Sequence, residues 1–298
     1  MADWHINEAV GILGATSLVG ECLLRLLKQH AIPVTACTRQ SVTSVDDGIH
    51  WHQLTRPESS AHSSQTACHK IPLWICAAPI WILAENFDFL ISHGVRQIVV
   101  LSSTSRFTKY ESTDINDQAV ARRLADAENH LRLWAEAHQV VWAILRPTLI
   151  YGLGRDKNIS EIAHFVRRFG FFPVFGSAKG LRQPLHVEDL AEACLLALGS
   201  TETKNRSYDI SGGETLTYRD MVRRIFVALD RTPRLITIPL WMFSAGIYLL
   251  KRVPRYEKWS SGMAERMNQD MFFEHSDAVR DFGFSPRKFL NPDDISSK

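Results

Sequence analysis

The sequence predicts an α/β fold, in which helices cover both faces of a doubly wound parallel sheet, with a smaller C-terminal lobe. Short apolar runs alternate with longer amphipathic stretches through the first half of the chain. A glycine-rich turn joins the first run to the first amphipathic stretch, and the rhythm changes after Tyr151. We therefore expect one domain at residues 1–150 and a lobe at 151–298, with segments near 185–215 packing back on the first domain.

Composition excludes several classes of protein. The 34 basic and 32 acidic residues give a net charge of +2, which leaves no electrostatic footprint for nucleic acid. The five cysteines form no CxxC pair and are typical of reduced thiols in the cytoplasm. The first ten residues lack the basic and apolar segments of a signal peptide. The twelve histidines show no ligand spacing, so we expect a cytoplasmic protein without a metal site.

Five apolar runs are expected to form buried parallel strands, because helical patterns separate them. They are Glu8–Leu13, Pro33–Thr38, Leu73–Ala77, Gln97–Leu101 and Val140–Leu145. Ligands of such sheets bind outside the carboxyl ends of the strands. Residues that would emerge at this edge are Gly14, Arg39, Ala77, Ser102 and Arg146. Their convergence predicts a ligand site there.

The turn GILGATSLVG has the outline of a phosphate-binding turn. Gly14 and Gly20 hold the first and last positions of GxxGxxG, and Ser17 replaces the middle glycine, which crowds the backbone approach. A helix that begins here directs its N-terminal amides and its dipole at an anion. We expect a dinucleotide to be held by the residues of the turn, namely Gly14, Thr16, Ser17, Leu18, Val19 and Gly20.

The end of the second expected strand bears on the choice of cofactor. An acid at this position binds the ribose 2′-hydroxyl of NAD, whereas a cation accommodates the 2′-phosphate of NADP. The chain has Thr38 followed by Arg39, and a guanidinium binds phosphate through charge-assisted hydrogen bonds. We expect NADP rather than NAD. The alternative is a solvated arginine at a strand end.

Three further segments lack a recognisable motif. The polar stretch Thr55–Lys70 is expected to be a surface loop. The apolar run Leu240–Leu250 falls short of the roughly 20 residues that span a bilayer. We expect it to be a buried or interface helix, with a membrane-surface or partner-docking helix as the alternative. The last forty residues are expected to form a helix-and-turn tail that packs on the C-terminal lobe.

Four more segments make the chain resemble the extended short-chain dehydrogenase/reductase family, the group of the NAD-dependent epimerases and dehydratases. They are VVLSST at Val99–Thr104, LRPTLIYG at Leu145–Gly152, LHVEDLAEA at Leu185–Ala193 and DISGGETLTYRDMV at Asp209–Val222. The resemblance spans nearly the whole chain. It implies a Rossmann-type fold, an NAD(P) cofactor and a small-molecule substrate such as a nucleotide sugar. Dimerisation through two long helices is common in similar proteins, so a homodimer is one expectation.

The catalytic pair of this family, a tyrosine and a lysine four residues apart on one helix face, is missing. Alignment on Glu128, which matches an acid that commonly follows the lysine by four, places Val120 and Leu124 at the two positions. Neither side chain transfers a proton. Tyr110 is the nearest tyrosine, but its neighbour Lys109 cannot share one helix face with it. A loop that brings Tyr110 over the nicotinamide is the alternative.

The resemblance assigns roles to several other residues. Ser103 or Thr104 would orient the substrate oxygen. Arg182 matches the arginine that binds the substrate diphosphate in related sugar-nucleotide enzymes, and a surface arginine paired with Glu188 or Asp189 is the alternative. Further expected cofactor contacts are Gln53 at the adenine, Ala77 and Ala78, Ser102, and Arg146 with Pro147 beneath the nicotinamide.

Two functions of different classes follow. The first is an NADP-linked oxidoreductase or epimerase-like enzyme that acts on a nucleotide sugar or a similar substrate. The second is a non-catalytic NADP-binding regulatory or assembly protein, like the NADP-sensing regulators or the accessory NADPH-binding subunit of respiratory complex I. The missing catalytic pair motivates the second hypothesis.

Overall fold

The computed structural model describes residues 4–40, 48–54, 70–241 and 265–290. The expected loop at Thr55–Lys70 and the apolar run at Leu240–Leu250 lie outside this part, except for Lys70, Leu240 and Trp241. Within the described ranges, no helix combines the length and the apolar character needed to cross a membrane.

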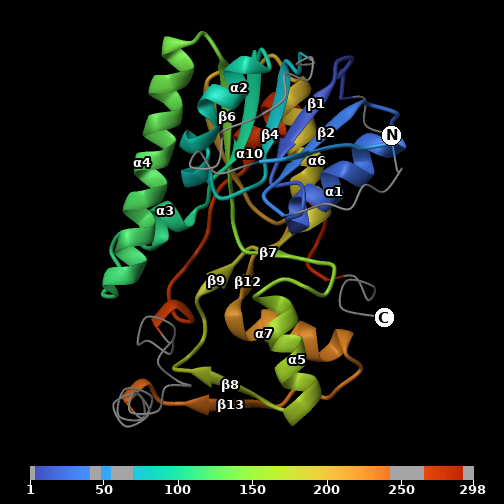
Figure 1. The fold of residues 1–298 in the computed structure, drawn as a ribbon. Helices are drawn as coiled ribbons and strands as arrows, with labels where there is room; N and C mark the ends of the chain where they lie inside the picture. The colour runs from blue at the N-terminus through green and yellow to red at the C-terminus, as the bar shows by residue number, and fades with distance from the viewer. Residues whose placement is uncertain (1–3, 41–47, 55–69, 242–264, 291–298) are drawn as a thin grey trace.

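A seven-stranded parallel sheet forms the larger part of the molecule and confirms the predicted fold class (Figure 1). Its order is β11-β6-β5-β4-β1-β2-β3. The strands are β1 (Val10–Leu13), β2 (Val34–Thr38), β3 (His50–Gln53), β4 (Leu73–Cys76), β5 (Gln97–Leu101), β6 (Val141–Pro147) and β11 (Arg206–Ile210). Strands β3 and β11 were not expected from the sequence. Both are edge strands, and their sequences HWHQ and RSYDI are partly exposed and lack a continuous apolar run.

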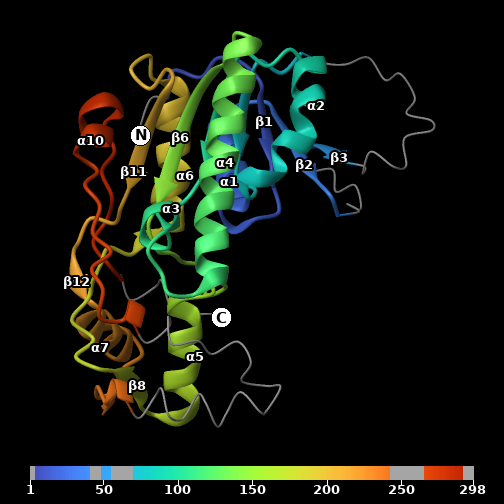
Figure 2. The ribbon, with the colours of Figure 1, turned by 90° about the vertical axis from the view of Figure 1, so that its left-hand side faces the viewer.

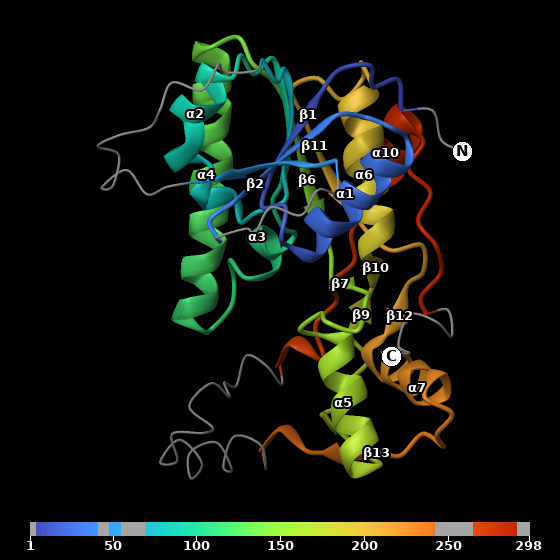
Figure 3. The same ribbon diagram turned by 45° about the vertical axis from the view of Figure 1, so that its right-hand side comes forward.

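Helices cover both faces of this sheet, and each face has its own apolar core (Figure 3). On one face, α1 (Leu18–Gln29) packs against α6 (Val187–Gly199). On the other face lie η2 (Ile80–Ile82), η3 (Ala84–Asn86), α2 (Phe87–Ser92) and α4 (Ile115–Ala137). Successive strand residues alternate between the cores: Val99 of β5 points to the α1 and α6 side, and Val100 to the α4 side. The short helix α3 (Ser105–Thr108) follows β5.

A smaller lobe lies below the carboxyl ends of the strands (Figure 1). It contains α5 (Ile159–Phe169), α7 (Tyr218–Ala228) and three strand pairs. These pairs join β7 (Ile150–Tyr151) to β10 (Leu185–His186), β9 (Leu181–Arg182) to β12 (Leu216–Thr217), and β8 (Phe172–Phe175) to β13 (Leu235–Ile238). Apolar residues of α5, α7 and β8 form a third core, separate from the two cores of the sheet.

The C-terminal segment does not pack only on the lobe, so this expectation was wrong for α10 (Ser276–Phe282). That helix lies beside β11 (Figure 2). Phe282 packs edge-on against Tyr208 of β11 at a ring-centroid distance of 5.2 Å, and the Tyr208 hydroxyl donates a 2.8 Å hydrogen bond to Asp281. Because β11 was not expected as a strand, no sequence pattern indicated a helix that would cover it.

Candidate functional site

The glycine turn between β1 and α1 is tightly packed against the start of the next loop. Gly14 has a φ of +81°, and a Cβ on it would lie 2.6 Å from the backbone nitrogen of Ala78. A Cβ on Gly20 would lie 2.4 Å from the Gly14 carbonyl oxygen. Glycine is therefore required at both positions, by backbone conformation at Gly14 and by close packing at both.

Ser17 has a defined structural role in this turn. It is the N-cap of α1, and its hydroxyl accepts a 3.0 Å hydrogen bond from the Gly20 amide. The Gly20 amide is therefore already engaged. The first-turn amides of Leu18 and Val19 have no intrahelical acceptor, and both residues line the cavity beside the turn. These two amides can donate hydrogen bonds to an anionic group.

Three adjoining cavities follow the carboxyl edge of the sheet, with volumes of about 220, 470 and 490 Å³. We call them the turn cavity, the central cavity and the lobe cavity. The turn and central cavities share Ser17, Ala78 and Pro79. The central and lobe cavities share Ser103, Ser105, Ile150 and Asn158. The shared residues show that the three cavities are neighbours, and we call the row that they form from the glycine turn to the smaller lobe the groove.

Most of the residues predicted from the sequence lie along this groove. The turn cavity is lined by Gly14, Thr16, Ser17, Thr38 and Arg39 among others. The central cavity is lined by Ser17, Leu18, Val19, Ala77, Ala78, Ser102, Ser103 and Pro147 among others. The lobe cavity is lined by Ser103, Thr104 and Arg182 among others. Gly20 lies behind them, packed against the turn.

Besides Gly20, three of the predicted site residues line none of the three cavities. Tyr110 is 68% exposed and lines none of the three cavities. Gln53 is exposed at the end of the edge strand β3, and its neighbour Leu54 lines the turn cavity instead. Arg146 lies within β6 rather than beyond its end, and its side chain joins an ion-pair network.

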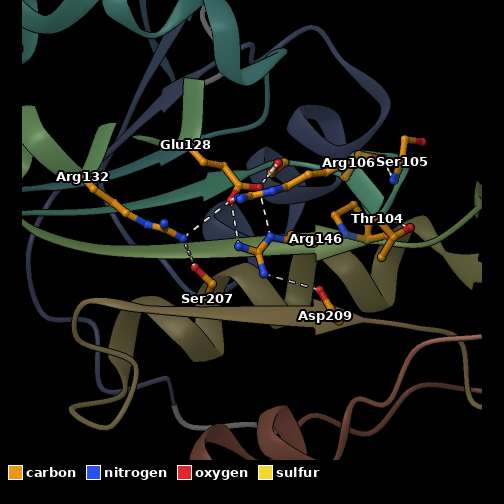
Figure 4. A network of polar contacts seen from close by, with 11 residues as sticks. Thr104, Ser105, Arg106, Glu128, Arg132, Arg146, Ser207 and Asp209 are labelled. Atoms are coloured by element: carbon orange, nitrogen blue, oxygen red, sulfur yellow. Dashed lines mark hydrogen bonds and ion pairs between the residues drawn. The ribbon is translucent and has the colours of Figure 1, made fainter. Parts of the chain in front are cut away.

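That network surrounds the fully buried carboxylate of Glu128 (Figure 4). Arg146 donates to both carboxylate oxygens, at 3.0 and 2.7 Å, and Ser102 donates at 2.6 Å. Arg106 forms a further ion pair with the same carboxylate. Burial alone would raise the pKa of Glu128, but the hydrogen bonds from Arg146 and Ser102 hold it below its usual value. Arg146 thus fixes the wall behind Ser102 rather than lining the groove.

Asp209 of β11 lies on the far side of the Arg146 guanidinium, 3.7 Å away (Figure 4). Burial raises the pKa of Asp209, and the neighbouring Glu128 carboxylate raises it further. The two acids therefore have opposite pKa shifts on either side of one arginine.

Apolar side chains occupy the positions of the missing catalytic pair. Val120 and Leu124 of α4 both line the central cavity, one turn apart and on the same helix face as Glu128. In the described part of this cavity wall, the hydroxyl groups belong to Ser17, Ser102, Ser103 and Ser105. The cavity can therefore orient an oxygen atom, but Val120 and Leu124 carry no group that would exchange its proton.

The lobe cavity is cationic. Lys109, Arg182 and Arg266 line it, and its described wall contains no acidic residue. Asp117 pairs with Lys109 at 2.7 Å and with Arg266, which leaves the group with an excess of positive charge. Lys109 and Arg266 were not predicted for this cavity. Arg266 is 84 residues from Arg182 in the sequence, so no local pattern could have linked them.

Arg182 is only 4% exposed. Its guanidinium donates to the carbonyl oxygens of Leu181 at 2.6 Å, Gln269 at 2.8 Å and Arg266. Burial lowers its pKa to about 10. The alternative that Arg182 is a surface residue paired with Glu188 or Asp189 was wrong. Those acids pair instead with arginines elsewhere, namely Arg25 and Arg287.

No group of three histidine, cysteine or acidic side chains able to hold a metal ion occurs within the described residues. The hydroxyl groups, backbone amides and cations of the groove are suited to phosphates.

Comparison with known proteins gives a family match over residues 87–211, to the model described as the NAD dependent epimerase/dehydratase family. Over 119 residues the chain is 23% identical to UDP-glucose 4-epimerase of Vibrio cholerae, covering 40% of this chain and 36% of that enzyme. It is 22% identical to the protein YbjS of Escherichia coli (strain K12) over 92% of each chain. A 97-residue segment is 26% identical to mitochondrial NADH dehydrogenase (ubiquinone) 1 alpha subcomplex subunit 9 of Arabidopsis thaliana, covering 32% of this chain and 24% of that subunit.

Solved structures share the fold over nearly the full chain. UDP-glucose 4-epimerase of Thermotoga maritima, solved with UDP-glucose, superposes with a TM-score of 0.70 at 13% identity, covering 96% of each chain. MoeE5 in complex with UDP-glucose and NAD gives a TM-score of 0.67 at 16% identity, covering 97% of this chain and 96% of that one. The chain is therefore similar to the NAD dependent epimerase/dehydratase family over residues 87–211, and it shares the fold of these solved structures over nearly its full length.

Proposed function

We propose that the chain binds NADP in the turn and central cavities and works as an oxidoreductase or epimerase-like enzyme on a nucleotide sugar or similar anionic substrate in the lobe cavity. The groove carries this proposal, because its neighbouring cavities extend from the glycine turn to a cationic cavity. The likeness to structures solved with UDP-glucose, and with NAD in one case, supports it.

NADP is proposed over NAD on the chemistry of the turn cavity. Thr38 and Arg39 line it, and its described wall has no acidic residue that would bind a free ribose hydroxyl. The Thr38 hydroxyl accepts a 3.1 Å hydrogen bond from the Gln40 amide and so holds the loop that carries Arg39. A guanidinium in this position suits a 2′-phosphate.

Ser103 is the residue proposed to orient the substrate oxygen. Its hydroxyl accepts a 3.1 Å hydrogen bond from the Ser105 amide, which leaves its proton free to donate into the groove. The Thr104 hydroxyl instead donates to the Pro147 carbonyl oxygen at 3.1 Å, so its proton is engaged. When bound, the nicotinamide would supply or accept a hydride, and Ser103 would polarise the oxygen at the reacting carbon.

A second candidate function is a binding protein that keeps the cofactor fold without its chemistry. The apolar wall formed by Val120 and Leu124 favours it, because proton transfer by a positioned side chain is the step that those positions would supply. The partial similarity to a subunit of mitochondrial NADH dehydrogenase also supports it.

Deuterium transfer distinguishes the two candidates. We would incubate the protein with NADPH deuterated on the transferred face and a panel of UDP- and dTDP-4-keto-sugars. In a parallel reaction we would supply oxidised NADP with UDP- and dTDP-sugars deuterated at C4, and we would examine sugars and cofactor by mass spectrometry in both. The proposed enzyme transfers deuterium, and Ser103→Ala slows transfer by about 100-fold or more. The matched control is Ser200→Ala, outside the groove. Tight NADPH binding without any transfer would contradict the enzyme and favour the binding protein.

A further inference from the structure

The loop Gly152–Asn158, between β7 and α5, forms a wall of the central cavity that the sequence analysis did not assign to the cofactor. Asp156, Lys157 and Asn158 line this cavity together with Ser17, Leu18 and Val19 of the glycine turn. A segment of the smaller lobe therefore faces the first turn of α1.

Asp156 fixes the conformation of this loop. It is 7% exposed. One carboxylate oxygen accepts from the amides of Asn158 and Ser160 at 3.0 and 3.1 Å, and the other accepts from the Ser160 hydroxyl and the Gly152 amide. Both oxygens are thus engaged within the loop and the start of α5.

An ion pair connects the same loop to α1. Arg155 donates to both carboxylate oxygens of Glu21, one of them at 3.3 Å. Glu21 lies in the first turn of α1, directly after Gly20. This contact and the internal hydrogen bonds of Asp156 place Lys157 beside the N-terminus of α1.

Lys157 is the one cation among the described residues that line the central cavity. The pyrophosphate of a dinucleotide carries two negative charges, and one amide of the turn, that of Gly20, already donates to Ser17. The Gly20 amide is therefore not available to the pyrophosphate, and a cation facing the turn would compensate for this missing donor. We propose that Lys157 binds the pyrophosphate of the dinucleotide from the side opposite the glycine turn. This inference rests on the proposed dinucleotide site.

Calorimetric titration with NADPH and with NADH tests the inference directly, without an activity assay. Both nucleotides contain the pyrophosphate, so Lys157→Ala should lower the affinity for each of them by the same factor of about ten. Lys157→Arg should retain most of the affinity. Arg39→Ala, by contrast, should weaken NADPH alone. Lys204→Ala, an exposed lysine outside the groove, removes the same charge and should change neither affinity.

Unchanged binding in Lys157→Ala would overturn the inference, as would an equal loss in Lys204→Ala, because the effect would then come from net charge alone. If the wild-type chain binds neither nucleotide, the proposed function and this inference both fail. If the wild-type chain binds and only the Lys157 result is negative, the proposed function stands and this inference alone is overturned.

Discussion

Glu128 is a fully buried carboxylate whose neighbours carry more positive charge than it can neutralise alone. Arg106 and Arg146 pair with it directly, and Arg132 lies at 3.7 Å. Asp209 supplies a second negative charge beyond Arg146. Because Ser102 also donates to this carboxylate, the network determines where the end of β5 meets the groove. Glu128 therefore acts on the site through the residues that it positions.

Glu128→Gln should lower the free energy of unfolding by about 3–5 kcal/mol at neutral pH, because it leaves buried guanidinium groups without their counter-charge. Chemical denaturation of the two proteins measures this difference. Glu136→Gln, an exposed change on the same helix, is the matched control and should cost less than about 0.5 kcal/mol. A Glu128 effect as small as that of the control would contradict the account.

The contribution of Glu128 should also depend on pH. Its pKa in the folded chain lies below the ordinary value of 4.5, since the hydrogen bonds from Arg146 and Ser102 outweigh the effect of burial. A carboxyl group with a lowered pKa stabilises the fold above its unfolded pKa and loses this effect as the pH falls through the folded pKa. The difference between wild type and Glu128→Gln should therefore narrow below about pH 4.5. A difference that stays constant under acid conditions would refute this assignment.

At the scale of elements, the unit of β1, glycine turn and α1 positions the start of the groove. The strand is fully buried, and α1 begins at an N-cap that the sequence itself supplies in Ser17. The close contact between Gly14 and Ala78 ties this unit to the loop after β4. Ala78 also lines both the turn cavity and the central cavity.

Gly14→Ala should disrupt both the turn and nucleotide binding. The added Cβ meets the Ala78 backbone at 2.6 Å and the φ of +81° disfavours alanine. Gly170→Ala is the matched control, since Gly170 has a φ of +74° but an added Cβ there meets nothing within 4 Å. We expect Gly14→Ala to cost about 1–3 kcal/mol more than the control in unfolding free energy. Calorimetry should show NADPH affinity lost in Gly14→Ala alone, and equal affinity in both variants would contradict this.

At the scale of the whole molecule, the C-terminal segment connects the lobe to the sheet. Met267 belongs to the core of the lobe, whereas Ala278, Phe282 and Phe284 belong to the core between the sheet and α1 with α6. Arg287 then pairs with Asp189 at 2.6 Å, on α6. The chain thus passes from the core of the lobe to the core of the sheet and returns to the lobe at Phe289.

Phe284→Ala should destabilise the protein by about 3–5 kcal/mol, because it empties a buried position in the core of the sheet. Phe284 is 2% exposed, whereas Phe272 on the same segment is 46% exposed. Phe272→Ala should therefore have little effect. Thermal unfolding followed by circular dichroism compares the two variants. Equal effects would show that α10 and the residues after it do not complete this core.

The parallel sheet and the glycine turn could be predicted because their signals are local. A buried apolar strand, a turn and an amphipathic helix follow one another within twenty residues of Gly11. Strand β3 was missed because an edge strand has polar, half-exposed residues. Lys157 and Arg266 were missed because the tertiary fold alone brings them to the groove. Tyr110 was considered on sequence proximity, which does not determine on which side of α3 a side chain lies.

The most direct test of the NADP assignment is a titration of NADPH and NADH against the wild-type chain and Arg39→Ala. Trp81 lines the central cavity, so fluorescence quenching reports binding there. We predict that the wild type prefers NADPH and that Arg39→Ala loses about tenfold or more of the NADPH affinity while its NADH affinity is unchanged. Equal wild-type affinity for the two nucleotides, or binding of neither, would contradict the account.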